Sequence, residues 1–191
     1  MELIIIRHGE AKHNLGKESE HVFAGNTIDN KLTTKGIKNA FNVADKLKND
    51  DIGIVYFSPL KRSRQTADII IRKLRKKISS QEIKDLSELN VGDLTGHTEK
   101  EVRNMFPVEA NTFYNADITH WNFPSGENFQ EISQRVDRLL EKIKASRTNK
   151  KILICGHGMI NRVIFYKIAF HNTKLWQERS YPHDKIVRLK I

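Results

Sequence analysis

Two histidines that stand beside glycines have the surroundings of phosphate-handling groups. His8 lies in Arg7-His8-Gly9-Glu10, directly after the apolar run Leu3–Ile6, and His157 lies in Gly156-His157-Gly158 after a second apolar run. A neutral imidazole is a nucleophile, and glycine lets the backbone turn sharply and lets a ligand approach closely. His8, expected to be exposed at a sheet edge, is therefore a candidate nucleophile. His157 is a candidate hydrogen-bond donor to a bound anion.

Two arginines complete the candidate phosphate site. A phosphoryl group in transfer carries negative charge on three equatorial oxygens, and guanidinium groups match that geometry better than ammonium groups do. Arg7 directly precedes His8, and Arg62 follows Ser58-Pro59 beyond the apolar run Ile52–Phe57. Neighbouring arginines also disfavour protonation of an imidazole by like-charge repulsion. These residues predict phosphorylation of His8, followed by release of phosphate to water.

The alkoxide that leaves in such a reaction needs a proton, and Glu88 is the candidate donor. It comes just after the apolar run Ile83–Leu86, so we expect it at the end of a strand. The negative charge of a bound phosphate favours the protonated form of a nearby carboxyl group. Glu88 is therefore predicted to act as the general acid.

The chain also carries the pattern of the elements that must position these side chains. Apolar runs predict five buried strands, at Leu3–Ile6, Ile52–Phe57, Ile83–Leu86, Ile152–Cys155 and Ile186–Ile191. Apolar residues at helical spacing predict three amphipathic helices: Ile37, Ala40, Phe41, Ala44 and Leu47; Ala67, Ile70, Ile71, Leu74 and Ile78; Phe129, Ile132, Val136, Leu139, Leu140 and Ile143. Thr98 and Glu101 predict a capping box, and a further helix is expected from about Met159.

Strands that alternate with helices predict an α/β fold, in which a largely parallel sheet is covered on both faces. Ligands of such sheets bind beyond the carboxyl ends of the strands. Because His8, Arg62 and His157 each follow a predicted strand, we expect them to meet at one edge of the sheet.

Length and composition set limits on the class of protein. The 191 residues, 38% of them hydrophobic, fit one domain over residues 1–191. The first apolar run is too short for a signal peptide or a membrane span, and Cys155 is the single cysteine, so a cytoplasmic protein without membrane contact is expected. The net charge of +10 favours anionic partners. Nucleic acid is a distant candidate, because no aromatic residues are interleaved with the basic runs.

The whole set of motifs resembles the histidine phosphatase superfamily, also called the phosphoglycerate mutase-like family. The resemblance rests on their order and spacing: Arg7-His8-Gly9-Glu10 with Asn14; Gly25, Asp29, Leu32-Thr33 and Gly36; Ser58-Pro59-Leu60 with Arg62 and Gln65-Thr66-Ala67; Glu88 with Gly92; Gly126-Glu127 with Arg135; Gly156-His157-Gly158. Two positions depart from the common pattern. Asn128 stands where many members have serine, and Asp93-Leu94-Thr95-Gly96 lacks the aromatic residue often found there.

The resemblance implies a three-layer α/β/α sandwich of the phosphoglycerate mutase-like type. It also implies that His8 is phosphorylated, that Arg7, Arg62 and His157 hold the phosphate, and that Glu88 donates the proton. Asn14 is then expected to contact phosphate or substrate, and Gly25 to offer a main-chain contact. The family uses neither a metal nor a cofactor.

Within this resemblance the expected activity is hydrolysis of a phosphomonoester. The mutase branch carries an adjacent arginine pair between the acid and the Gly-Glu motif, and residues 89–125 contain none. Mutase-type phosphoryl transfer is the alternative. A non-catalytic protein that binds a phosphorylated ligand is a weaker one, because the site residues are intact.

The expected partner is a small phosphorylated metabolite, with a phosphoprotein as the alternative. Phe113, Trp121 and Phe123 are expected in the core rather than at the mouth of a pocket. The sequence assigns neither the substrate nor the oligomeric state.

Overall fold

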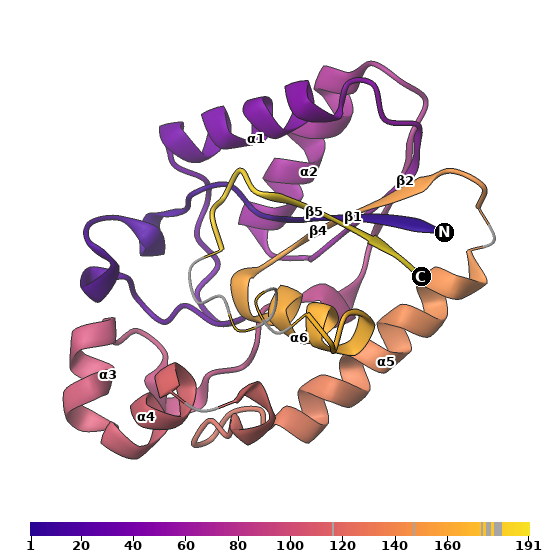
Figure 1. Ribbon diagram of the computed structural model, residues 1–191. Coiled ribbons are helices and arrows are strands. Elements are labelled where there is room, and N and C mark those ends of the chain that lie inside the picture. Colours follow the sequence, from indigo (N-terminus) through magenta and orange to yellow (C-terminus); the bar gives the residue numbers. More distant parts are fainter. Residues whose placement is uncertain (116, 147, 173, 175–176, 178–180) are drawn as a thin grey trace.

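The computed structural model describes residues 1–115, 117–146, 148–172, 174, 177 and 181–191 (Figure 1). In these residues five strands form one sheet, in the order β3-β2-β4-β1-β5. They are β1 (Glu2–Arg7), β2 (Ile52–Phe57), β3 (Ser79–Glu82), β4 (Lys151–Gly156) and β5 (Ile186–Lys190). All neighbouring strands are parallel except β5, which pairs antiparallel with β1 at the edge. The prediction of a mainly parallel sheet is confirmed.

Helices cover both faces of the sheet (Figure 1). α1 (Thr34–Leu47) and α2 (Lys61–Leu74) lie on one face, and α5 (Phe129–Ala145) and α6 (Gly158–Ile168) lie on the other. Two shorter helices, α3 (Glu99–Met105) and α4 (Pro107–Asn115), lie outside these layers (Figure 1). Short 3₁₀ turns lie at Lys12–Asn14, Glu18–Glu20, Lys84–Leu86, Gly92–Leu94 and Ile118–His120. None of the helices in the described ranges has both the length and the apolar composition needed to cross a bilayer.

Successive side chains of the central strands enter two separate cores. Leu3 and Ile5 of β1 pack in the core beneath α5 and α6, whereas Ile4 and Ile6 pack in the core beneath α1 and α2. Because both faces are buried, the strand has a continuous apolar sequence rather than an alternating one. Full burial of each such side chain stabilises the fold by about 1.5–3 kcal/mol. The predicted three-layer α/β/α arrangement is confirmed.

The prediction of a strand at Ile83–Leu86 is wrong. The strand is β3, whose four side chains are all exposed, and the chain then turns through the 3₁₀ helix at Lys84–Leu86. β3 is an edge strand that is held to β2 by backbone hydrogen bonds, so it does not require apolar residues. Ile83 and Leu86 are buried because they cover the core after the strand has ended.

Two of the predicted helix stripes need correction. In α1 the side chains of Ile37 and Phe41 are 41% and 43% exposed, and the face buried against the sheet contains Val43 instead. In α2 the helix ends at Leu74, because Arg75 takes a left-handed conformation with φ of 50°. Ile78 therefore lies beyond the helix, although it still packs against the core.

The capping predictions agree with the structure. Thr98 and Glu101 form the predicted capping box at the start of α3. Asn128, which departs from the common pattern, forms another one: its side chain accepts from the backbone N–H of Glu131 at 3.0 Å, and the Glu131 carboxylate accepts from the N–H of Asn128 at 2.9 Å. Asparagine therefore serves as well as serine at the start of α5. The helix expected near Met159 begins at Gly158, with His157 at its N-cap.

Candidate active site

The predicted site residues meet beyond the carboxyl ends of three adjacent strands. Arg7 ends β1 opposite Gly156 of β4, and the backbone N–H of His8 donates to the carbonyl oxygen of Gly156 at 3.0 Å. Arg62 enters from the first turn of α2, just after β2. The chain after β3 carries Glu88 to the N-terminus of α6.

His8 is held as a neutral imidazole. Its Nδ1 lies 2.7 Å from the carbonyl oxygen of Gly9, and because a carbonyl only accepts, Nδ1 must carry the proton. Burial, reinforced by the positive charges of Arg62 and Arg7, lowers the pKa of His8 well below its usual value. His8 is 1% exposed, so the expectation of an exposed histidine is wrong. The imidazole therefore leaves Nε2, with its lone pair, for the pocket.

The loop that carries His8 is fixed by its neighbours. The N–H of Gly9 donates to Oγ1 of Thr66 at 3.0 Å, and Nδ1 of His183 donates to the carbonyl oxygen of His8 at 2.6 Å. Gly9 also packs directly on α1, because a Cβ atom there would stand 2.2 Å from the carbonyl oxygen of Gly36. The Gly9 and Gly36 positions therefore bring the loop and the helix into contact without side chains between them.

Arg62 is anchored by three hydrogen bonds within the protein. Its Nη1 donates to the carbonyl oxygen of Ile28 at 2.9 Å, its Nη2 to that of Gly25 at 2.8 Å, and its Nε to Nδ1 of His157 at 3.2 Å. Each terminal nitrogen keeps a second N–H for a ligand. Gly25 takes a left-handed φ of 50°, and its carbonyl orients Arg62. Of the two neighbours Ala24 and Gly25, the cavity lining includes only Ala24.

His157 carries a donor without a partner. Because its Nδ1 accepts from Arg62, the ring proton of the neutral imidazole must lie on Nε2. That nitrogen is buried and has no hydrogen-bond partner in the described part of the chain. Burial and the charge of Arg62 lower the pKa of His157 well below its usual value. The rings of His8 and His157 are 5.0 Å apart, so an anion oxygen near His8 would satisfy this N–H.

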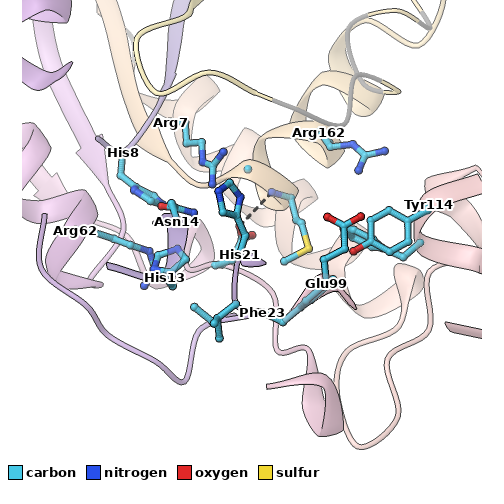
Figure 2. A pocket seen from close by; sticks show the side chains of 16 residues that line it. Arg7, His8, His13, Asn14, His21, Phe23, Arg62, Glu99, Tyr114 and Arg162 are labelled. Carbon is cyan, nitrogen blue, oxygen red and sulfur yellow. Dashed lines mark hydrogen bonds between the residues drawn. The ribbon is translucent and has the colours of Figure 1, made fainter. Parts of the chain in front are cut away.

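Asn14 and Arg7 add polar groups at the same end of the cavity as His8 (Figure 2). The Oδ1 atom of Asn14 accepts from the N–H of Ala11 at 3.2 Å, which leaves its amide nitrogen for a ligand. Arg7 donates from Nη1 to the carbonyl oxygen of Tyr181 at 3.1 Å. Both residues line the cavity.

Glu88 stands at the start of α6, with its carboxylate buried against backbone N–H groups. Oε1 accepts from the N–H of Ile160 at 3.0 Å and from that of Leu89 at 3.1 Å, and Oε2 accepts from the N–H of Met159 at 3.1 Å. The loop before it is held by Arg135, whose Nη1 donates to the carbonyl oxygen of Ser87 at 2.7 Å. The carboxyl group is therefore fixed in the wall of the cavity.

These side chains surround a cavity of about 240 Å³ (Figure 2). Its lining consists of Arg7, His8, His13, Asn14, His21, Val22, Phe23, Ala24, Arg62, Glu88, Glu99, Phe113, Tyr114, Gly158, Met159 and Arg162. Trp121 and Phe123 are buried in the core, as expected, whereas Phe113 packs on that core and also lines the cavity. His157 lies behind the lining, in contact with His8.

Two histidines near His8 were not identified from the sequence. The ring of His13 lies 5.8 Å from that of His8, and the ring of His183 lies 5.4 Å from it. Burial, with the charge of nearby arginines, lowers the pKa of His13 to about 2 and that of His183 to about 3. His13 directly precedes Asn14, and this position within the first motif could have indicated that it lies near His8. His183 has no comparable signal.

Among the described residues, no group of three or more histidine, cysteine, aspartate or glutamate side chains is arranged as a metal site. The polar atoms of the cavity are instead dominated by guanidinium and imidazole nitrogens, which suit an anion.

Comparison with known proteins identifies the family. The histidine phosphatase superfamily (branch 1) matches residues 3–191. The metal-independent phosphoserine phosphatase of Arabidopsis thaliana is 28% identical over 169 residues, which cover 88% of this chain and 68% of that protein. The probable phosphoglycerate mutase GpmB of Escherichia coli is 30% identical over 162 residues, covering 83% of this chain and 70% of that protein.

A solved structure agrees with this match. Bacillus stearothermophilus YhfR has a TM-score of 0.85 and 26% sequence identity, with 100% of this chain and 91% of that chain covered. The elements that carry Arg7, His8, Arg62 and His157 thus belong to a fold shared over the whole chain. This protein belongs to the histidine phosphatase superfamily (branch 1), and its relatives include both phosphatases and mutase-like proteins.

Proposed function

We propose that this protein hydrolyses phosphomonoesters through a phosphohistidine intermediate on His8. The observation that carries the proposal is the state of His8: its Nδ1 proton is donated to Gly9, its pKa is lowered by burial, and its Nε2 is left as a nucleophile. The surrounding donors supply the charge that a phosphoryl group requires.

The proposed reaction has two steps. Arg7, Arg62 and Asn14 bind the phosphate oxygens, the Nε2–H of His157 donates to one of them, and Gly25 acts through Arg62. His8 Nε2 attacks phosphorus while the bond to the leaving oxygen breaks, and Glu88 gives that oxygen its proton. Water then attacks the phosphohistidine and passes a proton to Glu88. The N–P bond breaks, and inorganic phosphate leaves.

The proposal includes independence from metal ions and cofactors. Guanidinium and imidazole donors would take the place that a cation has at other phosphoryl-transfer sites. Residues 1–191 are proposed to form one catalytic domain, and a cytoplasmic location remains a prediction. A cavity of about 240 Å³ suits a small phosphorylated metabolite better than a folded phosphoprotein.

Mutase-type transfer is the second candidate, because one relative is a probable phosphoglycerate mutase. The segment between Glu88 and Gly126 lacks the adjacent arginine pair of the mutase branch, and this favours hydrolysis. Phosphoglycerate interconversion, assayed beside phosphate release, distinguishes the two activities.

The test is turnover of p-nitrophenyl phosphate in the presence of a chelator. We expect activity in the native protein, and a loss of roughly 1,000-fold or more in His8→Ala. The matched control is His120→Ala, which removes an exposed histidine outside the cavity and should retain full activity. A quenched reaction should yield an acid-labile, base-stable phosphoenzyme. Turnover by His8→Ala at the rate of the native protein would contradict the covalent mechanism. A phosphoryl group found on serine or cysteine would also contradict it.

A further inference from the structure

The cavity has two chemically different ends. Figure 2 shows His8 and Arg62 at one end, and Glu99, Tyr114 and Arg162 at the other. A carboxylate is unexpected in a pocket that gathers anions, because it repels any second anionic group on the substrate. The mechanism proposed above makes no use of Glu99. Its position therefore requires a separate explanation.

The carboxylate of Glu99 is held in place through one of its two oxygens. Nε and Nη2 of Arg103 both donate to Oε1, at 3.2 and 2.7 Å. The guanidinium group of Arg103 also lies over the ring of Tyr114, 3.8 Å from its centroid. The side chain of Glu99 is 17% exposed, and its Oε2 makes no hydrogen bond within the described ranges. Oε2 is thus a positioned acceptor in the wall of the cavity.

Apolar side chains line the cavity along with these polar groups. Phe23 lies between the two ends in Figure 2, and its ring packs against that of Phe113 at 5.4 Å, while Met159 contributes further apolar surface. Such walls exclude water from the contacts that a ligand makes, which strengthens a charged hydrogen bond at the far end. The cavity is therefore cationic around His8, apolar in the middle, and of mixed charge at the far end, where the Glu99 carboxylate and the Arg162 guanidinium both line it.

We propose that the Glu99 end is a subsite for a protonated amine, with Oε2 as its acceptor. The substrate class would then be small phosphomonoesters in which an apolar linker joins the phosphate to an ammonium group. This inference rests on the proposed phosphatase function, since it assigns the non-phosphate part of the same substrate. Arg103 offsets part of the charge of Glu99, and the guanidinium group of Arg162 lines the same end, so the preference for an amine should be moderate rather than absolute.

The experiment compares two series of substrates, ω-aminoalkyl phosphates and n-alkyl phosphates of matched chain length. For the native protein we expect kcat/KM to favour the amine by roughly tenfold at the one chain length that spans the cavity. In Glu99→Gln this ratio should fall toward one, chiefly through a loss of kcat/KM on the aminoalkyl series. The control Glu141→Gln removes an exposed carboxylate from α5, outside the cavity, and should keep the native ratio.

A second variant tests the same subsite in the opposite direction. Arg103→Gln removes the cation that competes for Glu99, so the preference for the amine should increase. Thermal unfolding and p-nitrophenyl phosphate turnover verify that each variant is folded. Equal kcat/KM values for the two series at every length, or a ratio that survives in Glu99→Gln, would overturn the subsite alone. Absence of turnover on both series and on p-nitrophenyl phosphate would overturn the phosphatase function with it.

Discussion

The guanidinium group of Arg62 donates from Nε to Nδ1 of His157 across 3.2 Å, so the two proposed phosphate ligands are bonded to each other before any ligand arrives. This bond fixes the imidazole tautomer. It places the ring proton on Nε2, the buried nitrogen that has no partner in the described part of the chain. In the proposed site, Arg62 therefore has two roles: it binds the phosphate, and it prepares a second donor for it.

Arg62→Lys should impair both functions of this arginine. Lysine keeps the positive charge but cannot bond Gly25, Ile28 and His157 at once, so we expect kcat/KM for p-nitrophenyl phosphate to fall by roughly 10- to 100-fold. The ring ¹⁵N shifts of His157 should show loss of the single tautomer. Arg64→Lys, on the exposed side of α2 where it pairs with Glu82, is the control. If Arg62→Lys were as active as Arg64→Lys, the proposed role of Arg62 would be wrong.

Glu88→Gln should affect substrates according to their leaving group. Alkoxides need a proton as they leave and p-nitrophenolate does not, so we expect a loss of roughly 100-fold or more for alkyl phosphates and a much smaller one for p-nitrophenyl phosphate. The measurement is kcat/KM against the pKa of the leaving alcohol, which should become steeper in the variant.

A comparator separates this effect from a structural one. Glu127→Gln weakens the ion pair of Glu127 with Arg135, which is 3.0 Å long and holds the loop before Glu88. It should lower turnover of all substrates alike. Parallel losses in Glu88→Gln as well would show that Glu88 acts only by fixing the N-terminus of α6.

The buried histidines should make the fold sensitive to acid. The pKa of His13 is about 2 in the folded protein and 6.5 as its ordinary value, so below pH 6.5 the unfolded chain binds a proton that the folded one does not. The free energy of unfolding therefore falls as the pH falls, by up to about 1.4 kcal/mol per pH unit for each such histidine.

His13→Gln removes one of these groups. Between pH 6 and pH 5 the slope of unfolding free energy against pH should be shallower than in the native protein by nearly one proton. Urea unfolding at a series of pH values measures it. The matched control is His120→Gln, which changes an exposed histidine outside the cavity and should leave the slope unchanged. An unaltered slope in His13→Gln would mean that His13 is not buried as a neutral group.

The central strands could be predicted because burial on both faces of the sheet requires a continuous apolar sequence. β1 and β4 have continuous apolar sequences, and the motifs around His8 and His157 begin where those sequences stop. β3 has no apolar run, because an edge strand with exposed side chains is held by its backbone alone. Ile37 and Phe41 misled the prediction of α1 because helical spacing does not say which of two neighbouring faces is buried.

The contacts that orient the site residues were harder to predict than the residues themselves. His183 reaches the carbonyl group of His8 across 175 positions of sequence, and no local pattern reports such a contact. Gly25 was expected to offer a main-chain contact to the substrate, and the sequence did not indicate that its carbonyl group accepts from Arg62. Both interactions depend on how loops pack after the sheet has formed. Their residue types alone do not indicate that packing.

The two ends of the cavity come from different parts of the chain. The side chains near His8 belong to segments that follow strands of the sheet, whereas Glu99 and Tyr114 belong to α3 and α4, one short segment outside the sheet. We therefore expect mutations in that segment to alter what is bound without disturbing the proposed phosphate site. Substrate range and reactivity can therefore evolve independently in this architecture, and a new preference can arise while the old chemistry is preserved.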